Sequence, residues 1–122
     1  MSNISKPILI VCRKAPYRSS LAREAIDIAL AAAAFDQPLS LLFSGDGVYQ
    51  LMKEQNSEAI VSKNLGKVLT ALPLYGIDSL YADDSALRLR GLEIEDLLLP
   101  VQLLDTQKIK DLMANHAILI NI

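Results

Sequence analysis

Five short apolar stretches along the chain predict the strands of a sheet. The two clearest are Ile8–Cys12 and Leu39–Phe43, and Ser40 is the single polar residue that they contain. Apolar runs of about five residues are typical of strands that are covered on both faces, as in a parallel sheet. The other strands are expected at Ser79–Ala82, within Leu97–Leu103 and at Ala117–Ile120.

Between these stretches the apolar residues follow helical spacing. The first helix is expected to begin at Ser19 or Ser20 and to end near Phe35, and its second half, Ile28–Phe35, is apolar on every side. Further helical segments are expected at residues 48–52, 65–72, 83–90 and 105–115, with an acidic or hydroxyl side chain as cap in the last two. The alternation predicts one α/β domain over residues 1–122, with a five-stranded parallel sheet between two layers of helices.

Composition adds expectations about surroundings and partners. Apolar residues make up 52% of the 122 residues, yet no apolar run approaches the ~20 residues of a membrane span, and the run after Pro7 is too short for a signal peptide. We therefore expect a cytoplasmic protein that does not contact a membrane. The net charge of −2 argues against direct binding of nucleic acid.

The mean hydropathy of +0.30 is high for a domain of this size, so we expect apolar surface to be buried against partner subunits. The candidates for this interface come from the end of the first helix and from the short helix after the second strand. They are Ala33, Phe35, Val48, Tyr49 and Leu51.

Loops that follow parallel strands are where a site is expected, because the carboxyl ends of the strands meet at one edge of the sheet. The Arg13–Ser20 loop offers three cations and two hydroxyl groups to an anion, but it lacks the glycines of a phosphate loop, so a solvated, capping loop is favoured. Gly45-Asp46-Gly47 predicts a tight turn. Asp83-Asp84 has the chemistry of a Mg²⁺ or phosphoacceptor site, although capping of the following helix is the better interpretation.

The chain has one cysteine and one histidine. Cys12 lies inside the first strand, where a thiol is expected to be buried and inert, while its nearness to Arg13 and Lys14 keeps a reactive thiol open as an alternative. His116 has no evident nucleophilic partner and is expected to be structural. One cysteine excludes an internal disulfide and a cysteine-ligated metal site. We predict no catalytic residue, no metal site and no cofactor.

Six segments, in this order and spacing, carry a resemblance that covers nearly the whole chain. They are Arg13–Tyr17, Glu24-Ala25, Ala33–Gln37, Asp46–Leu51, Leu74–Ile77 and Ser85–Leu92. Together they resemble the DsrE/DsrF superfamily and, within it, the DsrF/TusC branch. The resemblance implies a flavodoxin-like, three-layer α/β/α fold.

The resemblance also implies partners and a pathway. A TusC-like subunit assembles with TusB-like and TusD-like subunits, as a dimer of heterotrimers, in a sulfur relay. That relay passes persulfide sulfur from a TusA-like carrier towards 2-thiouridine formation in tRNA wobble bases. The alternative is a DsrF-like subunit of a DsrEFH-type complex for sulfur oxidation.

In the TusD/DsrE branch a carrier cysteine stands eight residues before the glycine of an Arg-Gly pair. Counting back from Gly91 reaches Asp83, so the resemblance implies a non-catalytic subunit whose sulfur chemistry belongs to a partner. Two alternatives remain, a sulfurtransferase that uses Cys12 and an independent ligand-binding module that uses the Arg13–Ser20 loop.

The residues of the implied family motifs fall in or beside the loops that follow the strands. They are Arg13, Lys14, Pro16, Tyr17, Asp46, Gly47, Tyr49, Gln50, Asp83, Arg90 and Gly91. We expect the 13–17 and 46–50 loops to lie together beside Asp83, because all three follow parallel strands.

Overall fold

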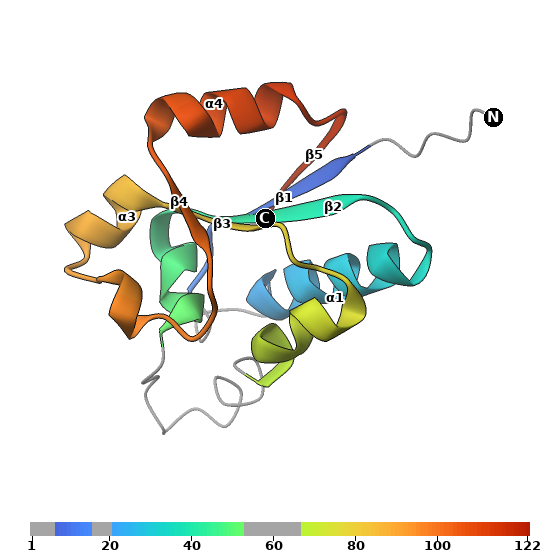
Figure 1. Ribbon diagram of the computed structural model, residues 1–122, viewed down its shortest axis with the longest axis horizontal. Coiled ribbons are helices and arrows are strands. Elements are labelled where there is room, and N and C mark those ends of the chain that lie inside the picture. The colour runs from blue at the N-terminus through green and yellow to red at the C-terminus, as the bar shows by residue number, and fades with distance from the viewer. Residues whose placement is uncertain (1–6, 16–20, 53–66) are drawn as a thin grey trace.

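The computed structural model describes residues 7–15, 21–52 and 67–122. These residues form one sheet of five parallel strands, in the order β4-β3-β2-β1-β5 (Figure 1). The strands are β1 (Ile8–Cys12), β2 (Leu39–Phe43), β3 (Leu80–Asp83), β4 (Gln102–Leu104) and β5 (Ile118–Asn121). The first two have the predicted bounds, and the predicted parallel sheet is confirmed.

The order of the strands determines where the helices lie. The chain crosses the sheet in one direction from β1 to β4 and then returns past β1 to β5. Because crossovers between parallel strands are right-handed, reversing the direction moves the connecting helix to the opposite face. Accordingly α1 (Leu21–Ala34) and the 3-10 helix η2 (Leu72–Tyr75) cover one face, and α4 (Thr106–Ala114) covers the other (Figure 1). The three-layer α/β/α architecture is confirmed, with a strand order different from the 2-1-3-4-5 of flavodoxin.

The two faces of the sheet are unequally packed. On the α1 face, buried residues of β1, β2 and β3 form one core cluster with Ala22, Ala25, Ile26 and Ala29 of α1. On the α4 face the described core holds three fully buried residues, Leu9, Val11 and Leu42, under the partly buried Ile109, Leu112 and Met113. Most of the apolar burial that stabilises the fold is therefore on the α1 face.

His116 fastens the carboxyl end of α4 to the sheet. Its Nδ1 lies 2.7 Å from the Leu112 carbonyl oxygen, and its Nε2 lies 3.2 Å from the hydroxyl oxygen of the buried Ser40 in β2. A carbonyl only accepts, so Nδ1 carries a proton, and in the neutral imidazole Nε2 then accepts from the Ser40 hydroxyl. The histidine is thus used in packing α4, as expected for a structural residue.

The fourth strand lies at the end of its predicted range and extends one residue beyond it. It begins at Gln102, whereas the apolar run starts at Leu97. Leu97 and Leu99 are buried although their backbone is irregular, and the backbone N–H of Leu98 donates to the Leu51 carbonyl at 2.7 Å. The run is therefore apolar because it packs beside residues 51–52, and only its last part pairs with β3.

The remaining helices lie near their predicted places. Residues 67–71 are helical and continue into η2, where Gly76 ends the segment at φ +83°. Short helices form at η1 (Gly45–Leu51), α3 (Asp84–Leu89) and η3 (Ile94–Asp96), the last of which was not predicted. Residues 19, 20, 65 and 66 at the predicted helix starts lie outside the described residues. No helix in the described part of the chain is both long and apolar enough to cross a membrane.

Gly47 and Gly45 give a matched test of the packing between η1 and β1. A Cβ at Gly47 would lie 1.8 Å from the Cys12 carbonyl oxygen, while a Cβ at Gly45 meets nothing within 4 Å and is opposed only by its φ of +54°. We expect Gly47→Ala to lower the free energy of unfolding by about 3 kcal/mol or more, and Gly45→Ala by about 1–2 kcal/mol. Urea unfolding followed by circular dichroism measures both, and equal losses would contradict the close contact.

Candidate functional site

The loops after β1, β2 and β3 meet at the carboxyl edge of the sheet. The backbone N–H of Ser44, after β2, donates to the Cys12 carbonyl at 3.0 Å. The Ser44 hydroxyl donates to Asp83 Oδ2, after β3, at 3.2 Å. The predicted meeting of the 13–17 and 46–50 loops beside Asp83 is confirmed for the described residues; Pro16 and Tyr17 lie outside them.

The helix η1 is the centre of this edge. It is a 3-10 helix, in which residues three apart lie on the same face. Each of its three faces therefore turns a pair of residues towards a different part of the molecule.

The first face of η1 enters the core. Val48 and Leu51 are both fully buried against the α1 face of the sheet. The expectation that these two residues offer apolar surface to a partner is wrong, because their spacing of three places both of them inward. Among the other interface candidates, Ala33 is half-buried against the core, Tyr49 is half-buried and Phe35 is 81% exposed.

The second face of η1 joins the loop after β1. Gly47 lets its backbone approach the Cys12 carbonyl, and the fully buried Gln50 donates from Nε2 to the Lys14 carbonyl at 2.8 Å. A buried hydrogen bond of this kind fixes the spacing of the two loops. The Gly45-Asp46-Gly47 pattern predicts a turn, and Gly45 has the positive φ that a turn of this kind needs. The φ of Gly47 is not positive, so the reason for a glycine at this position is its close approach to β1, which the pattern does not predict.

The third face of η1 meets α3 through one arginine. Asp46 Oδ1 accepts from Arg90 Nη2 at 2.9 Å and from Nε at 3.3 Å, and the guanidinium carbon lies 5.7 Å from the centre of the Tyr49 ring. Arg90 Nη1 also donates to the Ala86 carbonyl at 3.0 Å. Every nitrogen of the guanidinium is thus used inside the chain, so Arg90 is a structural residue of this edge.

Asp83 is the cap of α3. Its Oδ1 accepts from the Ser85 backbone N–H at 3.1 Å, the Ser85 hydroxyl at 2.8 Å and the Ala86 N–H at 3.4 Å. Its second oxygen accepts from Ser44, and Gly91 follows the helix at φ +67°. The capping interpretation is confirmed for Asp83, while the neighbouring Asp84 pairs instead with Arg88 at 2.6 Å on the surface.

The chemistry available at the edge is limited. Cys12 is 1% exposed, and burial raises the pKa of its thiol from 9.0 to about 12, so the expected buried thiol is confirmed. Arg13 and Lys14 are exposed beside it. Within residues 7–15, 21–52 and 67–122 there is no cluster of three groups that suits a metal ion. The carboxylate, amide and guanidinium groups of the edge are occupied in joining its loops.

The capping role of Asp83 is tested by substituting it and its neighbour Asp84 separately. Asp83→Ala removes four acceptor contacts, and we expect it to lower the free energy of unfolding by about 1–2 kcal/mol. Asp84→Ala removes an exposed ion pair and should cost less than about 1 kcal/mol. Asp83→Ser keeps a capping oxygen and should recover most of the loss in urea unfolding. If the two alanine variants are equally stable, Asp83 does not hold the edge together.

The chain resembles known proteins both in its sequence and in its fold. The sequence matches the model of the DsrE/DsrF-like family over residues 6–122. The Protein TusC homolog of Pseudomonas aeruginosa is 43% identical over 113 residues, which cover 93% of this chain and 95% of that protein. The intracellular sulfur oxidation protein DsrF of Allochromatium vinosum is 40% identical over 98 residues, covering 80% and 72% of the two chains.

The fold has a counterpart among solved structures. The crystal structure of the ychN protein from E. coli superposes with a TM-score of 0.76 at 19% identity, covering 98% of this chain and all of that one. Together with the match over residues 6–122, the extended identity to proteins named TusC and DsrF shows that this chain belongs to the DsrE/DsrF-like family.

Proposed function

We propose that this chain is a non-catalytic, TusC-like subunit of a TusBCD-type sulfur relay that supports 2-thiouridine formation in tRNA wobble bases. Its partners in this proposal are a TusB-like and a TusD-like subunit, in a dimer of heterotrimers that receives sulfur from a TusA-like carrier. The chain contacts neither the tRNA nor a membrane. The 43% identity to a TusC homolog, over 93% of the chain, supports this assignment.

The state of Cys12 carries the proposal. Sulfane sulfur is accepted by a thiolate, and thiolates of carrier proteins are partly exposed and have lowered pKa values. Cys12 is 1% exposed and the pKa of its thiol is raised to about 12. At neutral pH the single cysteine of the chain is thus protonated and shielded, so a sulfurtransferase that uses Cys12 is the weaker alternative.

Asp83 supports the same conclusion. It occupies the position to which the family resemblance assigns the carrier thiol, and a carboxylate cannot take up sulfane sulfur. In this chain the Asp83 oxygens accept hydrogen bonds from Ser44, Ser85 and Ala86, so the residue joins the loop after β2 to the start of α3. Sulfur transfer would then proceed on a partner subunit, with this chain supplying structure.

The DsrF-like role in sulfur oxidation is the second candidate, because the DsrF of A. vinosum is 40% identical over 80% of this chain. The buried Cys12 thiol and the Asp83 cap are compatible with either pathway. The two pathways are therefore distinguished by which product is lost when the gene for this chain is deleted. Loss of tRNA thiolation supports the relay, whereas intact thiolation with impaired sulfur oxidation supports the alternative. The ligand-binding alternative rests on a loop whose residues 16–20 lie outside the described part.

Cys12 should be dispensable for sulfur transfer. In a relay reconstituted with the partner subunits, Cys12→Ala should leave the rate of tRNA thiolation within about twofold of the wild type, because the buried thiol never carries sulfur. Omission of the whole subunit is the control and should abolish transfer. Loss of thiolation in the Cys12→Ala complex, with assembly intact by light scattering, would refute the proposal.

The thiol itself should be unreactive until the chain unfolds. The pKa difference between about 12 and 9.0 is about three units, so the thiolate fraction at pH 8 should be about a thousandfold lower in the folded state. Iodoacetamide should therefore modify Cys12 at least a thousandfold faster in guanidinium chloride than in buffer, after correction with a free thiol. Since the pKa is 9.0 in the unfolded state and about 12 in the folded state, the free energy of unfolding should be independent of this thiol well below pH 9 and should fall as the pH rises from about 9 to about 12. Comparable rates in the two states would contradict the burial.

A further inference from the structure

The strand β5 leaves one edge of the sheet open. It is the last strand in the order β4-β3-β2-β1-β5, and among the described residues it pairs only with β1. Ile122 turns both backbone groups to β1, because its N–H donates to the Val11 carbonyl at 3.0 Å and its carbonyl accepts from the Arg13 N–H at 2.8 Å. Alternate residues of a strand turn the other way, so the N–H and C=O groups of Leu119 and Asn121 point out of the sheet.

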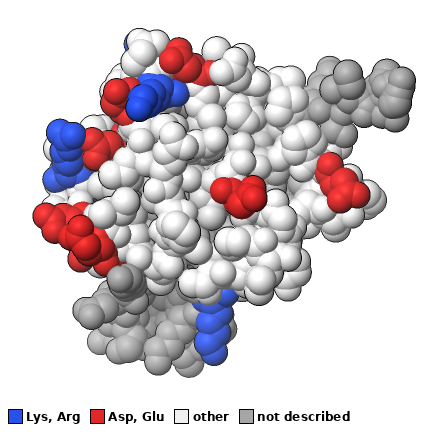
Figure 2. Space-filling view, in the orientation of Figure 1, with Lys and Arg blue, Asp and Glu red and all other residues white. Residues whose placement is uncertain are grey.

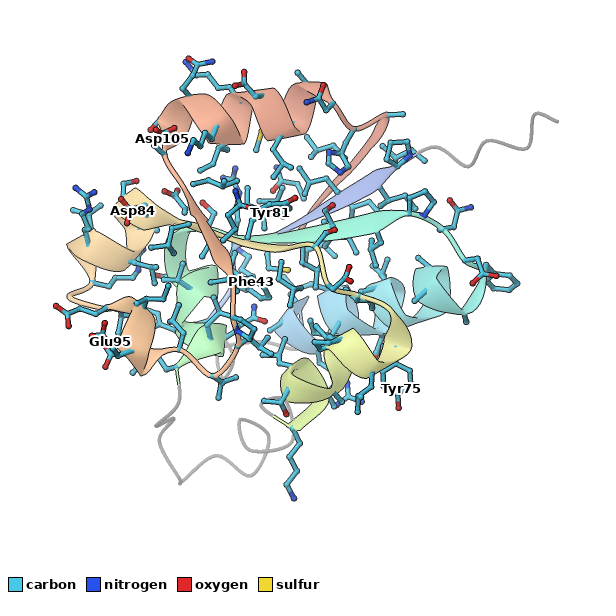
Figure 3. The ribbon with its side chains drawn as sticks, viewed as in Figure 1. Phe43, Tyr75, Tyr81, Asp84, Glu95 and Asp105 are labelled. Atoms are coloured by element: carbon cyan, nitrogen blue, oxygen red, sulfur yellow. The ribbon has the colours of Figure 1, made fainter. Side chains whose placement is uncertain are left out.

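The two edges of the sheet differ in how they are protected. Figure 2 shows charged side chains gathered over α3, η3 and α4, the helices that precede and follow β4 in the chain. Pro100 stands shortly before β4, and the exposed Asp105 stands between β4 and α4 (Figure 3). Proline and charge are devices by which proteins keep an edge strand from pairing. Residues 116–122, which contain β5, include no Asp, Glu, Lys, Arg or Pro, so their sequence carries neither device.

Both faces of β5 carry apolar side chains that are only partly covered. Ile118 is 38% exposed and Leu119 is 48% exposed, on opposite faces of the sheet. Ile120 and Ile122 lie on the same face as Ile118 and are partly buried against the core below α1. A strand added beside β5 covers all four side chains and pairs with the outward backbone groups. The edge therefore matches an extended strand, whose backbone has the same spacing of donors and acceptors, and not a helix.

The sequence of β5 is symmetric about Ile120, because Ile118 and Ile122 stand two residues to either side of it. When two β5 strands lie antiparallel about a two-fold axis at Ile120, each of these isoleucines therefore meets an isoleucine of the other copy. The same register places Leu119 of one copy opposite Asn121 of the other, so the outward groups of these residues form hydrogen-bonded pairs. β-Branched side chains that face each other across two strands stabilise the pairing. A second β5 thus fits this edge in both backbone and side chains.

The charges at the two ends of β5 suit the same arrangement. Arg13 and Lys14 are exposed beside the carboxyl end, next to Ile122. At the amino end of β5 lies the end of α4, which carries the negative side of the helix dipole and Asp111. An antiparallel copy brings the cations of one chain towards the end of α4 in the other. The cations of the two copies are roughly 20 Å apart along the strands, at about 3.3 Å per residue, which exceeds the screening length of about 8 Å.

We propose that β5 pairs antiparallel with β5 of a second copy of this chain, about a two-fold axis at Ile120, so that two five-stranded sheets become one. Both free edges of the joined sheet are then β4, where Pro100 and Asp105 oppose further addition, and the assembly closes at two copies. Main-chain hydrogen bonds supply affinity in contacts of this kind, so a large apolar area is not required. The inference rests on the strand edge and not on the sulfur relay.

A lysine on the edge tests the pairing. Leu119 on β5 is 48% exposed and Ile94 on η3 is 50% exposed, so Leu119→Lys and Ile94→Lys place the same charge at sites of matched exposure. The wild-type chain should be dimeric by light scattering at about 100 μM. Leu119→Lys should raise the dimer dissociation constant at least about tenfold, because the two-fold axis brings two lysines within about 8 Å, and Ile94→Lys by less than about twofold. A monomeric wild type, or equal effects of two variants that fold by circular dichroism, overturns the proposal.

Cross-linking tests the axis and the identity of the occupant, in the purified full chain and in the complex with its partner subunits. Residues opposite each other at a non-hydrogen-bonded position have Cα atoms about 4.5 Å apart, which suits a disulfide. Mild oxidation should therefore give a covalent homodimer of Ile120→Cys. It should give none of Leu119→Cys, whose counterpart lies diagonally at about 7–8 Å. Cys12 is buried and does not compete.

Three outcomes of the cross-linking contradict the proposal. They are a disulfide from position 120 to a different protein, no disulfide at all, and equal cross-linking at positions 119 and 120. The relay proposal is read out by tRNA thiolation of the Cys12→Ala complex, so its failure is distinguishable from the failure of this one.

Discussion

The contact between η1 and the end of β1 is the constraint on which the carboxyl edge depends. Gly47 lets the two backbones approach where a Cβ would lie 1.8 Å from the Cys12 carbonyl oxygen. Once η1 is held there, its repeat of three residues directs Val48 and Leu51 into the core and Asp46 and Tyr49 to Arg90. The loops after β1 and β2 and the end of α3 are thereby fixed relative to one another by a single short helix.

The right-handedness of the crossovers explains why the two faces of the sheet are covered by different numbers of helices and bury different amounts of apolar core. Three successive crossovers place α1 and η2 on one face, and the single returning crossover leaves α4 to cover the other. The α1 face can therefore bury a large core and still present apolar groups such as Phe35 and Leu74 on its outer side. Ile28–Phe35 and residues 68–77, which carry no charge, contribute buried side chains to the core on one side and exposed apolar side chains on the other.

Much of the fold was predictable from the sequence, because β1 and β2 are apolar runs whose ends coincide with polar residues. The strand β4 was expected within Leu97–Leu103, but its bounds were not predictable, because Leu97 and Leu99 are buried in irregular backbone and hydrophobicity alone does not distinguish that from a strand. The meeting of the three loops followed from the parallel sheet. Val48 and Leu51, three residues apart, share a face in a 3-10 helix and in an α-helix alike. Their sequence does not say whether that face turns to the core or to a partner, and the packing of η1 on the sheet decides it.

The hydrogen bonds that fill the carboxyl edge support the proposal of a non-catalytic subunit. Gln50, Asp83 and Arg90 are polar residues of the kind that binds ligands, yet each is engaged with a neighbouring loop or helix of the same chain. A hydrogen bond already made inside the fold must be broken before its groups can serve a substrate, which opposes a catalytic role. Large apolar side chains are exposed on α1 and η2, and also on α3, η3 and β5, and Arg13 and Lys14 are exposed after β1. In the proposed function these exposed apolar groups are available for association, while the hydrogen bonds of the polar edge hold the loops in place.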